Sequence, residues 1–157
     1  MANYAINNQL GGTQQNLSSS YKSIVIVTSS STTQARRGQI YDVMIGTDGT
    51  PADNAVVFDI SRQTAAGTAT SVTPNLLNPA DAAMLGAASA NATAEGTITA
   101  NSSVFFLGLN QRASYRWVAA PGSELVYPAT NLAGFALRAK SASYTSTVTA
   151  EILVTEI

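Results

Sequence analysis

Apolar residues recur at every second position in two stretches of the chain. Val148, Ala150, Ile152 and Val154 are separated by single residues that are mostly polar. Because the side chains of a β-strand point to opposite faces in alternation, this pattern predicts a strand that buries one face. Residues 56–61 (VVFDIS) show the same alternation and predict a second half-buried strand.

Two other stretches, residues 22–29 (KSIVIVTS) and 103–109 (SVFFLGL), are apolar on both faces. In the first, Ile24 and Ile26 are expected to share one face, with the valines on the other. A strand that is apolar on both faces is expected to be buried on both sides, within the sandwich or at an interface between subunits.

Turn-forming residues separate these stretches. Residues 48–54 (DGTPADN) predict a loop, and Pro121–Gly122 suits the two central positions of a type II turn. Residues 79–85 predict the one short helix, with Asn78 as its N-cap and Pro at its first position.

The alternation of strand and turn signals continues along the whole chain. It predicts about eight or nine strands and an all-β fold, an antiparallel β-sandwich of jelly-roll type. An immunoglobulin-like sandwich and a small barrel fit the same pattern. Residues 1–21 are polar and predict an extended N-terminal arm with a short strand near Tyr4–Ile6. Residues 22–157 are expected to form a single β-sandwich domain.

The composition narrows the functional classes. The 157 residues include no cysteine and no histidine, which excludes disulfide scaffolds, thiolate metal sites and Ser–His–Asp or Cys–His catalysis within the chain. Only 11% of residues are charged and the net charge is −1, unlike a nucleic-acid binder. The first 22 residues lack the pattern of a secretory signal, and no stretch is long and apolar enough to cross a bilayer. So few charges indicate a surface that is partly covered in an assembly.

Acidic residues offer two kinds of chemistry. Asp48, Asp53 and Asn54 could together bind Ca²⁺, but they lack the EF-hand spacing and suit an ordinary turn better. A glycosidase needs a pair of carboxylates, and four residues were considered for it: Asp42, Asp59, Glu95 and Glu124. None of them belongs to a recognisable motif, so we expect no enzyme activity, no cofactor and no metal.

Residues 110–128 (NQRASYRWVAAPGSELVYP) gather the large side chains of the chain, including its only tryptophan, Trp117. Their pattern predicts a hairpin in which Arg116 and Glu124 could form a cross-strand ion pair. Three interpretations of Trp117 remain open. It is a core anchor, part of a subunit interface, or part of a sugar-binding platform with Tyr115 and Tyr127.

Tyr, Trp and Arg are enriched at protein interfaces, and a pair of adjacent arginines could contact an acidic partner. The candidate interface consists of Arg112, Tyr115, Arg116, Trp117, Tyr127, Arg36 and Arg37.

From about Tyr41 onward the chain resembles a group of small virion proteins of tailed bacteriophages and prophages. The resemblance rests on the stretches TDGTPADN, ISRQTAAGTATSVTPN, NPADAA, NSSVFFLGLNQR and YRWVAAPGSELVYPAT. The size and the all-β pattern are similar to those of jelly-roll decoration, or cement, proteins of phage heads.

This resemblance implies a non-enzymatic capsid decoration protein. It would bind the outer surface of the head as a homotrimer and stabilise contacts between major capsid subunits. Its partners would be the major capsid protein and itself, without nucleic acid or membrane. It would be located on the virion after assembly in the host cytoplasm. The alternative is a receptor- or carbohydrate-binding module of a phage fibre or tail. A major capsid protein itself is disfavoured by the short chain.

Overall fold

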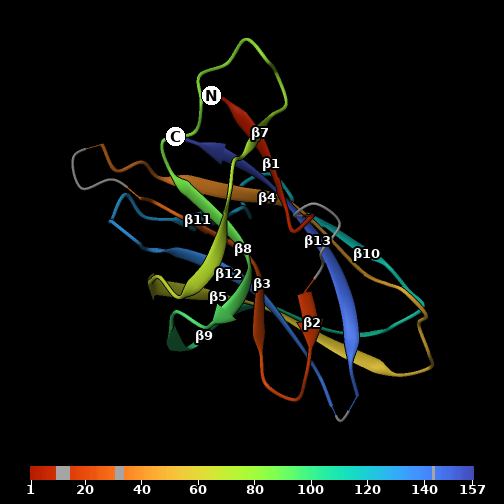
Figure 1. Cartoon of the computed structure of the whole chain (residues 1–157). Helices are drawn as coiled ribbons and strands as arrows, with labels where there is room; N and C mark the ends of the chain where they lie inside the picture. Colours follow the sequence, from red (N-terminus) through yellow and green to blue (C-terminus); the bar gives the residue numbers. More distant parts are fainter. Residues whose placement is uncertain (10–14, 31–33, 143) are drawn as a thin grey trace.

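A computed structural model describes residues 1–9, 15–30, 34–142 and 144–157. These residues form two antiparallel β-sheets that pack face to face as a sandwich (Figure 1). The predicted all-β sandwich is therefore confirmed. The described part of the chain has no helix that is long and apolar enough to cross a membrane.

The first sheet, called sheet 1 below, has β4 and β13 at its centre. β10 and β11 pair with successive parts of β4, and β1 and β2 pair with successive parts of β13. Its strands are β10 (Tyr115–Val118), β11 (Leu125–Tyr127), β4 (Gly38–Asp48), β13 (Ser146–Glu156), β1 (Asn3–Asn7), β2 (Gln15–Leu17) and β7 (Asn75–Leu76).

The second sheet, sheet 2, has six strands, of which β6 and β9 are the edges. In spatial order its strands are β6 (Thr68–Val72), β8 (Ala87–Ala94), β3 (Lys22–Thr28), β12 (Gly134–Ser141), β5 (Ala55–Ala65) and β9 (Thr97–Asn110).

The strand order is that of a jelly roll. β1 and β2 can be counted as one interrupted strand, and so can β10 and β11. Eight principal strands then remain when the additional strands β6, β7 and β8 are set aside. Numbered along the chain, they are ordered 1-8-3-6 in sheet 1 and 2-7-4-5 in sheet 2. The described residues form thirteen strands rather than about eight or nine, because two principal strands are interrupted and three further ones are inserted.

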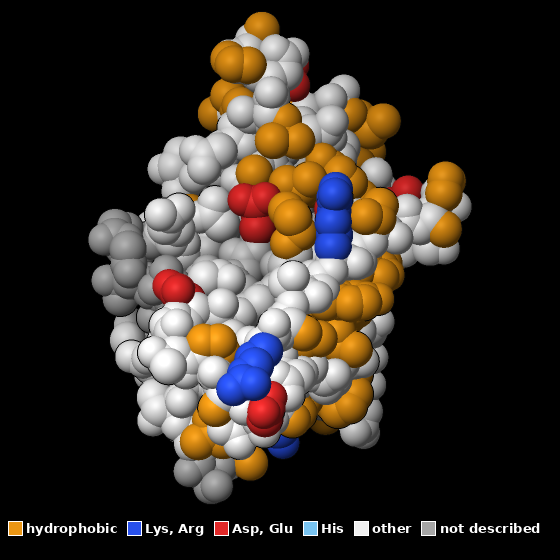
Figure 2. Space-filling view, turned by 90° about the vertical axis from the view of Figure 1, so that its right-hand side faces the viewer, with side chains coloured by type: hydrophobic (Ala, Val, Ile, Leu, Met, Phe, Trp, Pro, Cys, Tyr) orange, Lys and Arg blue, Asp and Glu red, His pale blue; other side chains and the backbone are white. Residues whose placement is uncertain are grey.

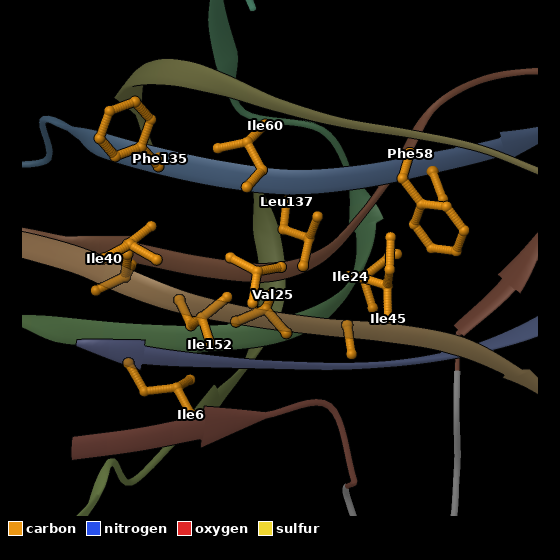
Figure 3. Close-up of a cluster of buried hydrophobic side chains, with 14 of the residues drawn as sticks. Ile6, Ile24, Val25, Ile40, Ile45, Phe58, Ile60, Phe135, Leu137 and Ile152 are labelled. Atoms are coloured by element: carbon orange, nitrogen blue, oxygen red, sulfur yellow. The ribbon is translucent and has the colours of Figure 1, made fainter. Parts of the chain in front are cut away.

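The core lies between the inner faces of the two sheets. Figure 3 shows Ile60 and Leu137 of sheet 2 above Ile40 and Ile152 of sheet 1. Ile152 belongs to the predicted alternation of β13, whose inward residues are all buried. Fully burying such a side chain contributes about 1.5–3 kcal/mol, so these two apolar faces hold the sandwich together.

The predicted faces of β3 are wrong at one residue. Val25 pairs with Leu137 and Ser23 pairs with Arg138, so Ile24 is an extra residue opposite that junction. This β-bulge turns Ile24 toward the main core, whereas Ile26 packs in a small separate cluster with Ala92 and Ala136. β3 is thus buried on both sides within one chain.

The predicted helix at residues 79–85 is wrong. Asn78 does cap a turn, because its Oδ1 accepts from the Ala80 N–H at 3.2 Å, but no helical turn follows. The backbone instead bonds to distant side chains. The Leu85 N–H donates to Glu156 at 2.9 Å, and the Tyr4 hydroxyl donates to the Ala82 carbonyl at 2.9 Å. A two-turn helix is too short to outweigh such contacts.

The described parts of residues 1–21 belong to the sandwich rather than to a separate arm. The predicted short strand is confirmed as β1, but Tyr4 and Ile6 are buried in the core, as is Leu17 of β2. β1 pairs with β13, so the two chain ends lie side by side (Figure 1).

Candidate interaction site

The stretch that gathers the large side chains forms one interrupted edge strand. β10 and β11 both pair antiparallel with β4 and therefore run in the same direction, so the predicted hairpin is wrong. The predicted type II turn is confirmed. Gly122 has φ +85°, and the Ser123 N–H donates to the Ala120 carbonyl at 2.8 Å. The turn belongs to a loop that leaves the edge of β4 and returns to it.

Two aromatic side chains of β10 face the core. Tyr115 pairs with Ile45 and Trp117 with Val43, both inward-facing residues of β4. Each ring lies 6.3 Å from the Phe105 ring of β9, centroid to centroid. Because β9 and β10 are edge strands of different sheets, these rings close one side of the sandwich. Trp117 is half-buried against the main core, which agrees with the core-anchor interpretation.

Tyr127 offers no surface to a partner, because only 1% of it is exposed. Its ring covers Gly38, where a Cβ atom would overlap it. The hydroxyl has no hydrogen-bond partner among the described residues. Burial, with a smaller contribution from Glu156, raises the pKa of Tyr127. Together with the inward orientation of Trp117, this removes two rings from the suggested sugar-binding platform.

Arg116 is held by Asp42 and not by Glu124 as the sequence suggested. Its Nε lies 3.1 Å from both carboxylate oxygens of Asp42. The Asp42 side chain is 3% exposed and that of Arg116 is 60% exposed, so the arginine covers the carboxylate from the solvent side. The hydrogen bond to Asp42 raises the pKa of the Arg116 guanidinium.

The other candidate arginines lie at separate places. Arg112 forms an exposed ion pair with Asp53 at 3.2 Å. Arg36 and Arg37 are also exposed, but they precede Gly38 at the opposite end of β4. Tyr127 pairs with Gly38 and Tyr115 with Ile45, seven positions further along β4, which corresponds to roughly 23 Å. The seven candidate residues therefore do not form one cluster.

The outer face of sheet 1 carries a groove of about 740 Å³. Its lining includes Asn7, Met44, Arg116, Thr149 and Glu151 from adjacent strands. Figure 2 looks at the side of the molecule on which β10 and β13 lie in Figure 1, and shows charged side chains among apolar and uncharged ones. Glu151 accepts from the Asn7 amide at 3.3 Å. The groove thus offers hydrogen-bonding groups beside an apolar floor.

The most exposed aromatic side chain is one that the candidate set omitted. Phe106 of β9 is 69% exposed and points away from the core, as does the exposed Val104. The sequence had marked residues 103–109 as a possible interface strand, and the structure leaves their outer face open. The only sequence signal for Phe106 was the apolar run in which it lies. That run contains Phe105 and Phe106, and the sequence does not show which of the two faces inward.

Three of the four acidic candidates for catalysis, Asp42, Asp59 and Glu95, are held by other contacts. Asp42 is bound to Arg116 on sheet 1, whereas Asp59 is bound to Arg138 on sheet 2. Glu95 accepts from the backbone N–H and the hydroxyl of Ser23 at 2.8 and 2.6 Å. No group of three or more acidic side chains that could hold a metal ion occurs in the described part of the chain.

Neither a scan of protein-family models nor searches of curated proteins and of solved structures found a match to this chain.

Proposed function

We propose that the chain is a structural protein of a bacteriophage virion that decorates the outer surface of the capsid. In this role it binds the major capsid protein as a homotrimer and stabilises contacts between neighbouring subunits. The observation that carries the proposal is an exposed, uncharged and apolar strand at the edge of a jelly-roll sandwich. Such an edge suits a protein whose surface is covered in an assembly.

Two further features support this role. The charges of the described surface are few and several are already paired within the chain, as in Arg112–Asp53 and Arg116–Asp42. The stretches that resemble phage virion proteins include β9 and the β10–β11 edge, which lie together on one side of the sandwich. Many identical weak contacts on a capsid lattice would add to strong retention.

Sedimentation with capsids tests the proposal. Capsids of the phage that encodes the chain, assembled without it, are mixed with increasing amounts of purified protein and pelleted. We expect saturable co-sedimentation and a higher temperature of capsid disruption. The double variant Arg36→Glu/Arg37→Glu should bind more weakly if the exposed basic pair contacts an acidic shell. Protein that stays in the supernatant at every concentration contradicts the decoration role.

A second candidate function is glycan binding, and the groove on sheet 1 favours it. Asn7, Thr149 and Glu151 can donate to or accept from sugar hydroxyls, and Met44 gives an apolar contact. Titration with the surface polysaccharide of the host cell tests this function. Glu151→Ala should weaken binding about tenfold, because a hydrogen bond to a charged group is lost. Leu77→Ala, an exposed residue outside the groove lining, serves as the control.

A further inference from the structure

β9 has a bare edge. Nine of its fourteen residues pair with β5 on one side, regularly over Phe105–Asn110 and with β-bulges before that, and among the described residues no strand pairs with the other side. Long edge strands are normally protected by charged side chains, proline or a covering segment, because their free N–H and C=O groups recruit other strands. Residues 97–110 (TITANSSVFFLGLN) contain neither a charged residue nor a proline.

The outer face of this edge is apolar and uneven. Phe106 and Gly108 alternate with the inward-facing residues Phe105, Leu107 and Leu109, so they lie on the solvent side of sheet 2. Val104 is an extra residue at a β-bulge, because Phe105 pairs with Ile60 and Ser103 with Ser61, and it is exposed as well. Phe106 stands out, whereas at Gly108 a Cβ atom would meet nothing within 4 Å. The outer face of β9 therefore has a projecting ring at Phe106 and, two residues further along, unfilled space at Gly108.

The neighbouring strand leaves no net charge beside this face. Asp59 pairs with Phe106 across the β5–β9 ladder, and Arg138 neutralises it through an Nε–Oδ2 hydrogen bond of 2.9 Å. Arg138 in turn lies over the Tyr21 ring at 4.6 Å. An apolar strand that pairs with β9 would thus meet no unpaired charge on the adjacent strand opposite Phe106.

We propose that β9 pairs antiparallel with β9 of a second copy of this chain, about a two-fold axis at Phe106. In this register Phe106 lies opposite Phe106 of the second copy. Val104 of each copy lies opposite Gly108 of the other, so a side chain fills the open position. The two sheets 2 then form one continuous sheet, and the contact is self-complementary as a two-fold axis requires.

The inward side of the strand fits the same register. Phe105 lies opposite Leu107 of the second copy, which extends the core across the junction. Tyr115, whose ring contacts Phe105 at the open side of the sandwich, becomes covered. A fully enclosed phenylalanine buries about 150–250 Å². The two Phe106 rings, each 69% exposed, therefore supply at most roughly a quarter of the ~1,200 Å² at the low end of specific interfaces.

Charge substitution at position 106 tests the pairing. Light scattering over a dilution series is expected to show Phe106→Lys and Phe106→Glu each with half the assembly mass of the wild type. An equimolar mixture of the two variants should restore the full mass, because Lys and Glu then lie opposite each other. Leu77→Lys is the control, since it charges an exposed apolar residue away from β9 and should leave the mass unchanged.

Two further tests fix the register. A Cβ atom at Gly108 meets nothing within 4 Å in its own chain, so Val104→Lys/Gly108→Lys should keep the monomer fold. It should halve the assembly mass, because each new lysine lies opposite a lysine of the second copy, whereas Val104→Lys/Gly108→Glu should keep the wild-type mass because opposite charges then face each other. The chain has no cysteine, so Phe106→Cys introduces a single thiol. Directly opposite residues have Cβ atoms about 4.5–5.5 Å apart, close enough for mild oxidation to link the copies after small shifts. Leu77→Cys should not cross-link.

The inference stands apart from the decoration role, because these tests use the free protein. The halving is expected whether the wild type has twice the 16.2 kDa chain mass or is a larger assembly of trimers joined in pairs. A wild type that is monomeric at every concentration overturns the pairing. So does an assembly mass that Phe106→Lys and Val104→Lys/Gly108→Lys leave unchanged, with circular dichroism confirming that both are folded. A monomeric wild type would also contradict the proposed homotrimer, but neither result decides whether the chain binds the capsid.

Discussion

Each sheet has one buried aspartate on its outer face, and an arginine from a neighbouring strand binds each of them. Arg116 covers Asp42 on sheet 1, and Arg138 covers Asp59 on sheet 2. The Arg138 guanidinium also donates to the Ser61 hydroxyl at 3.0 Å. These contacts allow β4 and β5, each with a buried aspartate, to lie between two other strands of a sheet, because each buried charge has a partner.

The Asp59–Arg138 pair is expected to affect stability far more than an exposed pair does. Asp59→Asn leaves the largely buried Arg138 without its counter-charge and should cost about 3–5 kcal/mol of unfolding free energy. Asp53→Asn makes the same chemical change in the Arg112 pair, whose side chains are 73% and 59% exposed, and should cost about 0–1 kcal/mol. Urea unfolding of both variants measures the difference. Equal losses would contradict the role of burial.

Tyr127→Phe is expected to maintain or raise stability. The buried hydroxyl has no partner among the described residues, and an unmatched group of this kind costs about 1–3 kcal/mol. Tyr4→Phe is the matched control. Tyr4 is equally buried but donates to the Ala82 carbonyl, so its loss should cost about 0.5–1.5 kcal/mol.

The same substitution should change the response to alkaline pH. Burial raises the pKa of Tyr127 in the folded chain above the unfolded value. Below about pH 10 the phenol is protonated in both states and stability is unaffected. As the pH rises further, the unfolded chain ionises while the folded chain keeps its proton, so stability falls. Unfolding free energies measured from about pH 9 to 11 should decline less steeply in Tyr127→Phe than in the wild type. An identical slope would show that Tyr127 does not hold its proton.

At the scale of elements, the sequence predicts strands well and their neighbours poorly. The alternation in residues 147–155 identified the buried face of β13 because the pattern depends only on the chain itself. The bulge at Ile24 was missed because it is defined by pairing with β12, more than a hundred residues away. The hairpin at residues 115–127 was wrong for the same reason. Its turn was correctly predicted, but both strands found a better partner in β4.

Two glycines of β4 should differ sharply in their tolerance of a side chain. At Gly38 a Cβ atom would overlap the Tyr127 ring, so Gly38→Ala must displace a buried aromatic residue. Overpacking of this kind costs about 1–3 kcal/mol. At Gly46 the nearest atoms to a Cβ, from Thr149 and Ser114, are 3.6 and 3.7 Å away, so Gly46→Ala should be nearly neutral. Thermal unfolding of the two variants compares them within one strand, and a neutral Gly38→Ala would contradict the close packing described here.

At the scale of the whole molecule, the chain ends are part of the sandwich. β1 pairs with β13 over Asn3–Asn7, and Tyr4 and Ile6 complete the core. Polar composition suggested an arm because every second residue of this short strand faces solvent, and five residues are too few for a clear periodicity. The residues predicted to form one interface lie apart in the structure for a related reason. Residue type identified Trp117 and Tyr127 as large side chains typical of interfaces, but only the fold shows that both face inward while Phe106 faces outward.

The proposed pairing of β9 couples this fold to the protein concentration. If unfolding separates two copies, the folded state is favoured by mass action and the melting temperature rises as the chain becomes more concentrated. We therefore expect wild-type melting temperatures to increase across a hundredfold concentration series. The melting temperatures of Phe106→Lys should stay nearly constant if the two-fold contact is the only contact between copies, and those of Leu77→Lys should follow the wild type.

A melting temperature of Phe106→Lys that still rises with concentration would identify a second contact between copies, as the proposed trimer requires. A wild-type melting temperature that is independent of concentration would count against both. β9 would then be an edge that stays exposed in the free protein, and its apolar face would have to be covered by the capsid itself.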